Sequence, residues 1–149
     1  MKSLKSKLFR SFFQNVGGMV HPSTKLELIR EIGIRLDRGQ YDMNDIDTSK
    51  ITDMSYLFTG YKNIPDIDIS KWDVSNVKYM TAMFYGCTNF NSDLSKWDVS
   101  NVEYMNSMFY YCKNFNSDLS KWDVSNATKM KEMFKKSGVT PLPEWYKEQ

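Results

Sequence analysis

One stretch of the sequence occurs three times in succession, and it constrains the fold more than any other feature. Its middle copy runs from Leu94 to Phe115, and the tryptophans of the three copies, Trp72, Trp97 and Trp122, are 25 residues apart. A fixed period in this range is typical of repeat proteins, in which each unit buries its apolar side against its neighbours. We therefore expect one continuous stack of units.

The middle copy predicts a strand followed by a short helix. Leu94-x-x-Trp97-x-Val99 fits the L-x-x-L-x-L strand segment of leucine-rich repeats, with Trp97 and Val99 pointing inward. Ser100 is placed to cap a helix, and Glu103 completes a capping box. Apolar residues follow at helical spacing: Val102, Met105, Met108 and Phe109. The predicted fold class is α/β, a short right-handed leucine-rich-repeat-like solenoid with parallel strands on one face and short helices on the other.

The chain before the repeats predicts a capping helix. Thr24 is the expected N-cap, because Glu27 lies three positions on. Gly39 ends the helix, and the only histidine, His21, looks structurally incidental. The expected apolar stripe consists of Leu28, Ile29, Ile32 and Leu36.

The resulting organisation has a basic head and hinge followed by the repeat solenoid. Its predicted parts are the head (1–21) and the solenoid (22–149), the latter divided into a capping helix (22–41), about four turns (42–140) and a C-terminal cap (141–149).

The first 17 residues predict a basic amphipathic helix. The apolar face, a candidate anchor, consists of Leu4, Leu8, Phe9, Phe12 and Phe13. Such a helix can fold back over the open end of the stack, dock on a partner, or lie on an anionic membrane. Membrane contact is expected only through residues 1–17. No secretion signal is recognisable in the segment, which favours a cytoplasmic or particle-associated protein.

Composition and charge exclude several classes of function. The net charge is +2, but residues 1–21 carry +4, so the rest of the chain is mildly acidic, unlike a nucleic-acid binder. One histidine, no glycine-rich phosphate loop and no metal-ligand spacing argue against an enzyme, a cofactor or a metal site. Cys87 and Cys112 are expected to be buried thiols, although a bridge between adjacent turns stays open.

Charged and aromatic residues on the predicted surfaces are the candidates for partner binding. Two ladders follow the predicted strands, one of lysines (Lys71, Lys96, Lys121) and one of aspartates (Asp47, Asp73, Asp98, Asp123), with Ser95 beside them. They predict either a self-compensating charge lattice or a surface for a protein or glycan, with calcium along the aspartates as a third alternative. The tyrosines on or beside the predicted helices are Tyr79, Tyr85, Tyr104, Tyr110 and Tyr111. Tyrosines that stay exposed favour interfaces.

The repeat wording resembles that of a known bacterial family. W-D-V-S-N-V-x-x-M-x-x-M-F-x-x-C-x-x-F-N-x-D-L-S, covering roughly residues 42–134, is similar to the BspA-type leucine-rich-repeat surface proteins. The resemblance implies a cell-surface location and a role in protein binding and adhesion.

Two functional hypotheses follow. The first is a non-enzymatic module that binds a protein partner of unknown identity through its strand face or its tyrosines. The second is a structural or assembly component, encoded for example by a phage or mobile element, which the N-terminal helix anchors.

Overall fold

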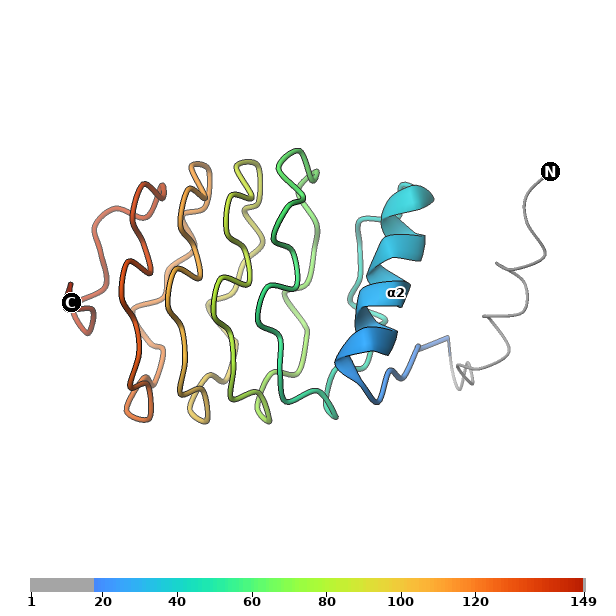
Figure 1. Cartoon of the computed structure of the whole chain (residues 1–149), viewed down its shortest axis with the longest axis horizontal. Helices are drawn as coiled ribbons and strands as arrows, with labels where there is room; N and C mark the ends of the chain where they lie inside the picture. The colour runs from blue at the N-terminus through green and yellow to red at the C-terminus, as the bar shows by residue number, and fades with distance from the viewer. Residues whose placement is uncertain (1–17, 149) are drawn as a thin grey trace.

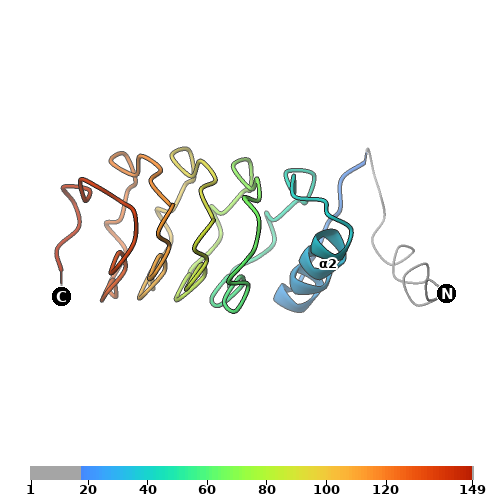
Figure 2. The ribbon, with the colours of Figure 1, turned by 90° about the horizontal axis from the view of Figure 1, so that it is seen from above.

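The computed structural model describes residues 18–148, and in it the chain forms a row of irregular turns that lie side by side (Figure 1). Helix α2 (Lys25–Asp37) lies at one end of the row, and the C-terminus lies at the other. The successive turns follow one another in chain order, as Figure 2 shows from above. Residues about one sequence repeat apart are therefore neighbours in space.

Helix α2 starts with the capping box that the sequence predicts. The hydroxyl of Thr24 accepts a hydrogen bond from the Glu27 N–H at 3.2 Å, and the Glu27 carboxylate accepts one from the Thr24 N–H at 3.2 Å. Leu28 and Ile32 are buried against the first turn, whereas Ile29 is 38% exposed, so the expectation that Ile29 faces the core is wrong. The helix thus covers the apolar side of the first turn with a narrower stripe than predicted.

The predicted fold class is wrong. Helix α2 is the only helix within residues 18–148, and that range holds no β-strand, only isolated parallel bridges such as Tyr79 with Tyr104. Neither the parallel strands nor the short helices expected in each repeat are formed. The turns are built from tight bends instead.

Left-handed backbone conformations explain why the predicted repeat helices do not form. Ser107 has φ +54° and Tyr111 has φ +60°, whereas an α-helix needs φ near −63° throughout. The other turns repeat both bends, at Tyr56, Ala82 and Glu132 for the first and at Gly60, Gly86 and Lys136 for the second. Two bends per repeat are incompatible with a continuous helix.

The backbone hydrogen bonds of this segment alternate between two kinds of partner. The N–H of Met108 donates to Met105 O within the same turn at 3.3 Å, and the N–H of Phe109 donates to Met133 O in the next turn at 2.9 Å. The adjacent turn before it repeats the inter-turn bond, from Phe84 to Met108 at 3.0 Å. The segment predicted to be helical therefore carries a ladder of backbone bonds between turns, which we call the backbone ladder.

The segment predicted to be strand is joined mainly by side chains. The indole N–H of Trp97 donates to Ile69 O at 3.2 Å, and the side-chain amide of Asn101 donates to Ser75 O at 2.7 Å. Ser100 caps no helix, because its N–H and its hydroxyl both donate to Asp98, at 3.1 and 2.6 Å. The prediction placed the inter-turn backbone hydrogen bonds on the strand face, whereas the structure places them in the segment predicted to be helical.

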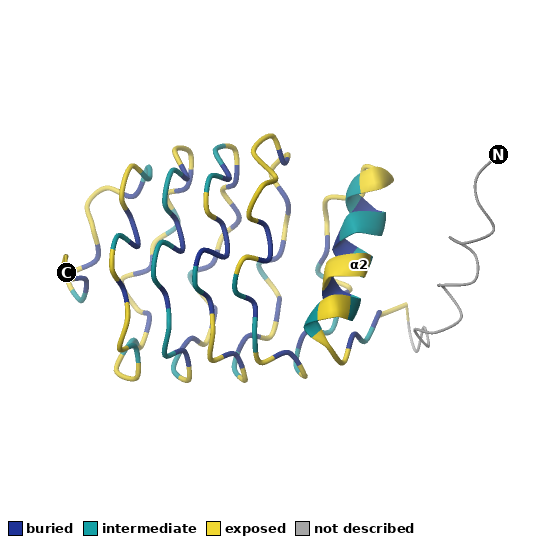
Figure 3. Ribbon diagram, viewed as in Figure 1, coloured by how far each residue is buried: buried dark blue, intermediate teal, exposed yellow. Residues whose placement is uncertain are grey.

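The core runs through the row of turns as stacked side chains. Phe58, Phe84, Phe109 and Phe134 form a column with ring centroids 5.5, 5.5 and 5.7 Å apart. Burial alternates along each turn, as Figure 3 shows, and Trp97 is only 4% exposed, as predicted.

The two cysteines are buried in the core as free thiols. The thiol of Cys112 donates to Phe84 O at 2.9 Å, and that of Cys87 to Phe58 O at 3.3 Å. The inter-turn bridge left open by the sequence is not formed.

Candidate functional site

The predicted aspartate ladder is tied down by neighbouring serines. Asp98 accepts two hydrogen bonds from Ser100, and Asp123 accepts the Ser125 N–H at 3.0 Å. These bonds, the serine hydroxyl first, hold the pKa of Asp98 and of Asp123 below the usual value. Asp73 makes the same pair of bonds with Ser75, at 3.0 and 2.6 Å. These carboxylates shape the turns, which uses part of their hydrogen-bonding capacity.

The predicted lysine ladder faces a different set of acids from the one expected. The charges of Lys71, Lys96 and Lys121 contribute to lowering the pKa of Asp68, Asp93 and Asp118, respectively, after the larger effect of hydrogen bonds from the adjacent serines. These aspartates precede the lysines by three residues and were missed as a ladder, although the repeated D-x-S signals an Asx turn.

Ser95 belongs to the same arrangement. Its N–H donates to Asp93 at 2.9 Å, and it lines a shallow depression of about 530 Å³ together with Lys96, Lys121 and Asp118. Positive and negative side chains thus alternate on this face, which we call the aspartate–lysine face (Asp68, Lys71, Asp93, Lys96, Asp118 and Lys121).

The predicted tyrosines come together along the backbone ladder. Tyr79 stacks on Tyr104 with ring centroids 5.2 Å apart, and Tyr85 stacks on Tyr110 at 4.9 Å. Tyr79 is 43% exposed and Tyr85 is 39% exposed. Tyr111 meets Tyr110 edge-on at 4.8 Å. The structure therefore places the five tyrosines in two groups, one of two rings and one of three, at the surface of two adjacent turns.

Lysines take over the tyrosine positions in the next turn, which the sequence analysis missed. Lys129 lies 25 residues after Tyr104 and is bridged to it, and Lys135 lies 25 residues after Tyr110 with its Nζ 5.8 Å from the ring centroid. The Lys136 ammonium donates to the Tyr111 hydroxyl at 2.7 Å, which lowers the pKa of Tyr111 and raises that of Lys136. Aligning the fourth turn on the third is the signal that reveals this substitution.

We call this surface the tyrosine–lysine face. It consists of Tyr79, Tyr85, Tyr104, Tyr110, Tyr111, Lys129, Lys131, Lys135 and Lys136.

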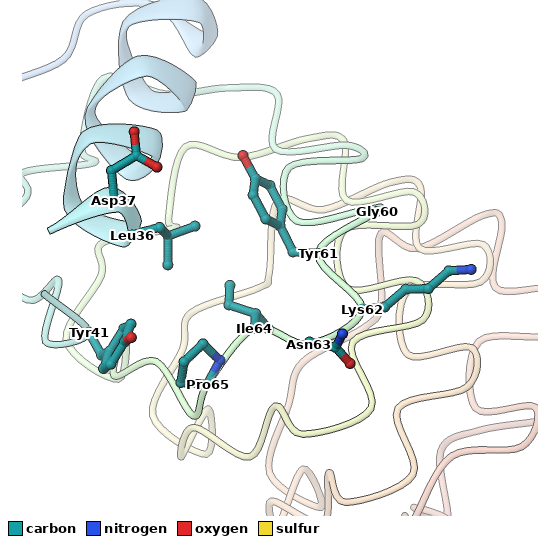
Figure 4. Close-up of a pocket in the computed structure, with 9 residues that line it drawn as sticks. All are labelled: Leu36, Asp37, Tyr41, Gly60, Tyr61, Lys62, Asn63, Ile64 and Pro65. Atoms are coloured by element: carbon teal, nitrogen blue, oxygen red, sulfur yellow. The ribbon is translucent and has the colours of Figure 1, made fainter. Parts of the chain in front are cut away.

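A pocket of about 520 Å³ lies where α2 meets the first turn (Figure 4). Leu36 from α2 lines it with Tyr41, Tyr61 and Ile64. The first turn is one residue longer than the later turns. No side-chain nitrogen or oxygen buried within residues 18–148 lacks a hydrogen-bond partner, so the pocket displays no unsatisfied group that points to a ligand.

The sequence suggested that His21 is structurally incidental, and this expectation is wrong. Its Nδ1 lies 2.8 Å from the Asp47 carboxylate, so it ties the segment before α2 to the first turn. Hydrogen bonds from Ser49, followed by that from His21, lower the pKa of Asp47 to about 2.

Residues 18–148 contain neither a metal-binding cluster nor a membrane-spanning helix. That range holds no cluster of three or more histidine, cysteine, aspartate or glutamate side chains suited to a metal ion. It also holds no helix with the length and apolar character needed to cross a bilayer. The candidate anchor residues Leu4, Leu8, Phe9, Phe12 and Phe13 lie outside the described part of the chain.

Comparison with known proteins defines the family. The profile described as "Mycoplasma protein of unknown function, DUF285" matches residues 34–143, which is most of the chain and includes all the turns of the tyrosine–lysine face. The chain belongs to this family, which is related to the BspA-like proteins. A search of the curated proteins and a search of the solved structures find no match to this chain.

Proposed function

We propose that the chain is a non-enzymatic protein-interaction module that binds its partner through the tyrosine–lysine face. The observation that carries the proposal is the gathering of five partly exposed tyrosines on two adjacent turns. Tyrosine combines a large apolar ring with a polar hydroxyl, and it is enriched where proteins bind one another. We prefer this face to the aspartate–lysine face, where neighbouring charges offset one another.

The backbone ladder supports the proposal because it holds the tyrosines in place. The N–H of Gly86 donates to Tyr110 O at 2.8 Å, and the N–H of Met80 donates to Tyr104 O at 2.8 Å. The backbone carbonyls of Tyr104 and Tyr110, and that of Tyr79, which accepts from the Met54 N–H at 2.8 Å, are thus hydrogen-bonded across turns. A side chain that is already ordered loses less conformational entropy on binding.

The repeats also suggest the biological setting. Because they resemble the BspA-type surface proteins, we propose that the partner is a protein met in surface adhesion.

Affinity capture with paired variants tests the proposed face. The intact chain is immobilised as bait, and the proteins it retains from the organism that encodes it are compared with those retained by Tyr85→Ser/Tyr110→Ser and by Lys96→Ser/Lys121→Ser. We expect the tyrosine pair to lose the retained proteins and the lysine pair, on the aspartate–lysine face, to keep them. Equal retention by both pairs contradicts the proposal.

A further inference from the structure

We infer that the tyrosine–lysine face takes an acidic segment of a partner protein, one rich in Asp or Glu, with its carboxylates at the C-terminal end of the face. The inference rests on the proposed function and adds the chemistry of the partner. It follows from how charge, ring stacking and hydrogen bonding are distributed along the face.

The positive charge at the C-terminal end is poorly compensated. Neither Lys129 nor Lys131 lies within salt-bridge distance of an acid among the described residues. Lys136 donates to the hydroxyl of Tyr111 and forms no salt bridge with a carboxylate among the described residues. Only Lys135 is paired, with Glu132. Lys129, Lys131 and Lys136 therefore have no salt-bridge partner among the described residues, and of these Lys131 acts at longer range on Glu132.

The N-terminal end of the same ladder is compensated. Asp53, which is bridged to Tyr79, accepts a hydrogen bond from the Lys25 ammonium of α2 at 3.1 Å. The tyrosines thus lie between a neutral end and a cationic end. A partner segment that carries acids beside an apolar patch can therefore bind in one direction only, with its acids at the C-terminal lysines and its apolar patch on the tyrosines.

The stacking of the tyrosines favours a peptide over a nucleic acid. A nucleobase binds by stacking on an aromatic face that is free. The faces of Tyr79 and Tyr104 are turned to each other, as are those of Tyr85 and Tyr110, with interplanar angles of 26° and 10°. One face of each of these rings is therefore covered, and Lys135 lies over the ring of Tyr110. The hydroxyls remain available, and a phenol hydroxyl donates well to a carboxylate.

The aspartate–lysine face provides a matched comparison within the same molecule. Lys71, Lys96 and Lys121 repeat with the same period and also form no salt bridge, but the charge of each acts on an aspartate three residues earlier. If lysines alone attracted acids, both faces would bind equally. The inference predicts that only the tyrosine–lysine face does.

The experiment measures binding of the intact chain to a fluorescein-labelled alternating Glu-Gly dodecapeptide by fluorescence anisotropy. The triple variant Lys129→Glu/Lys131→Glu/Lys136→Glu is compared with Lys71→Glu/Lys96→Glu/Lys121→Glu, which changes net charge equally. Circular dichroism melts establish that both variants fold. We expect the first variant to weaken binding by about tenfold or more and the second by less than about twofold, at ionic strength near 0.05 M where surface charges are little screened.

Three results overturn the inference: no binding of the peptide by the unmodified chain, equal weakening by both variants, or tighter binding of a thymidine dodecanucleotide than of the peptide. Concentration-dependent self-association that the first triple variant abolishes also overturns it, because the occupant is then a second copy of the chain. If the peptide fails but the tyrosine pair still loses its captured proteins, the inference fails and the proposed function stands. If the tyrosine pair keeps them, both fail.

Discussion

The indole N–H of Trp97 donates to the carbonyl oxygen of Ile69, 28 residues earlier, at 3.2 Å. Trp122 makes the same bond to Leu94, and Trp145 makes it to Leu119, at 2.9 and 2.8 Å. Trp97 and Trp122 therefore fill the core of their own turns, Trp145 packs against it partly buried, and each indole also fastens its turn to the preceding one. Burial alone would be satisfied by other large apolar side chains, whereas the indole also supplies a donor.

Replacing the central tryptophan tests this double role. Trp97→Ala removes a buried ring that contacts Phe84 and leaves the Ile69 carbonyl without its donor. We expect it to lower the free energy of unfolding by about 3–5 kcal/mol, which is a large part of the total stability of a typical domain. Trp97→Phe keeps most of the apolar volume and should cost less. Denaturant melts followed by circular dichroism measure both, and an unchanged midpoint for Trp97→Ala contradicts the inward placement.

Two glycines give opposite predictions for the same substitution. Gly86 has φ +75°, and a Cβ there meets no atom within 4 Å, so Gly86→Ala adds only backbone strain, about 1 kcal/mol of destabilisation. Gly33 lies within α2 in equally open space, so Gly33→Ala should stabilise by about 0.5–1 kcal/mol. Chemical denaturation of the two variants checks both signs. A Gly86→Ala variant with an unchanged or higher free energy of unfolding would mean that the bend is not left-handed in solution.

The pH dependence of stability should include a contribution from Asp47. Its folded pKa of about 2 lies below the unfolded value of 3.8, so its stabilisation is fully present above pH 4 and is lost as the pH falls through 2. Because Asp47 is partly exposed to solvent, we expect this contribution to be about 1 kcal/mol.

Asp47→Asn keeps the shape and removes the charge, so it should lower stability at pH 7 and flatten the fall between pH 4 and 2. Thermal melts across this range measure both effects. His21→Ala is the companion variant, because it removes one donor to Asp47 and leaves Ser49 in place. An Asp47→Asn variant with the unmodified pH profile would exclude the contribution.

The cysteines should be unreactive in the folded protein. Burial raises the pKa of Cys87 to about 12 and also raises the pKa of Cys112, and the thiolate is the reactive form. We expect Ellman's reagent to label neither thiol in the native state and both after denaturation. Rapid native labelling of either cysteine, or fewer than two thiols after denaturation without reductant, goes against the buried, unbridged arrangement.

The candidate site could be predicted only in part. Tyr79, Tyr104 and Tyr110 are recognisable as surface candidates because they fall between apolar repeat positions. That they stack in pairs depends on the contact between turns. The pairing of each lysine with the aspartate three residues before it, as at Lys96 and Asp93, also depends on how the bend folds. Local sequence does not state which way such a side chain turns.

The sequence by itself determined which repeat positions are apolar and face the core, and where α2 begins. The apolar period places Val99, Met105 and Phe109 in the core, and Thr24 with Glu27 fixes the helix start through contacts three residues apart. The helix start is a local property. The apolar period is likewise written within each repeat, but burial of its side chains requires the neighbouring turns, as the stacking of Phe109 on Phe84 and Phe134 shows.

Only the tertiary structure decided the backbone conformation of the repeats. The apolar spacing of Met105, Met108 and Phe109 suits a helix and a run of tight bends equally. The bends are stable because the N–H of Phe109 finds its acceptor at Met133, a carbonyl that is within reach only when the next turn has docked. The choice between helix and bend therefore belongs to the stack of turns.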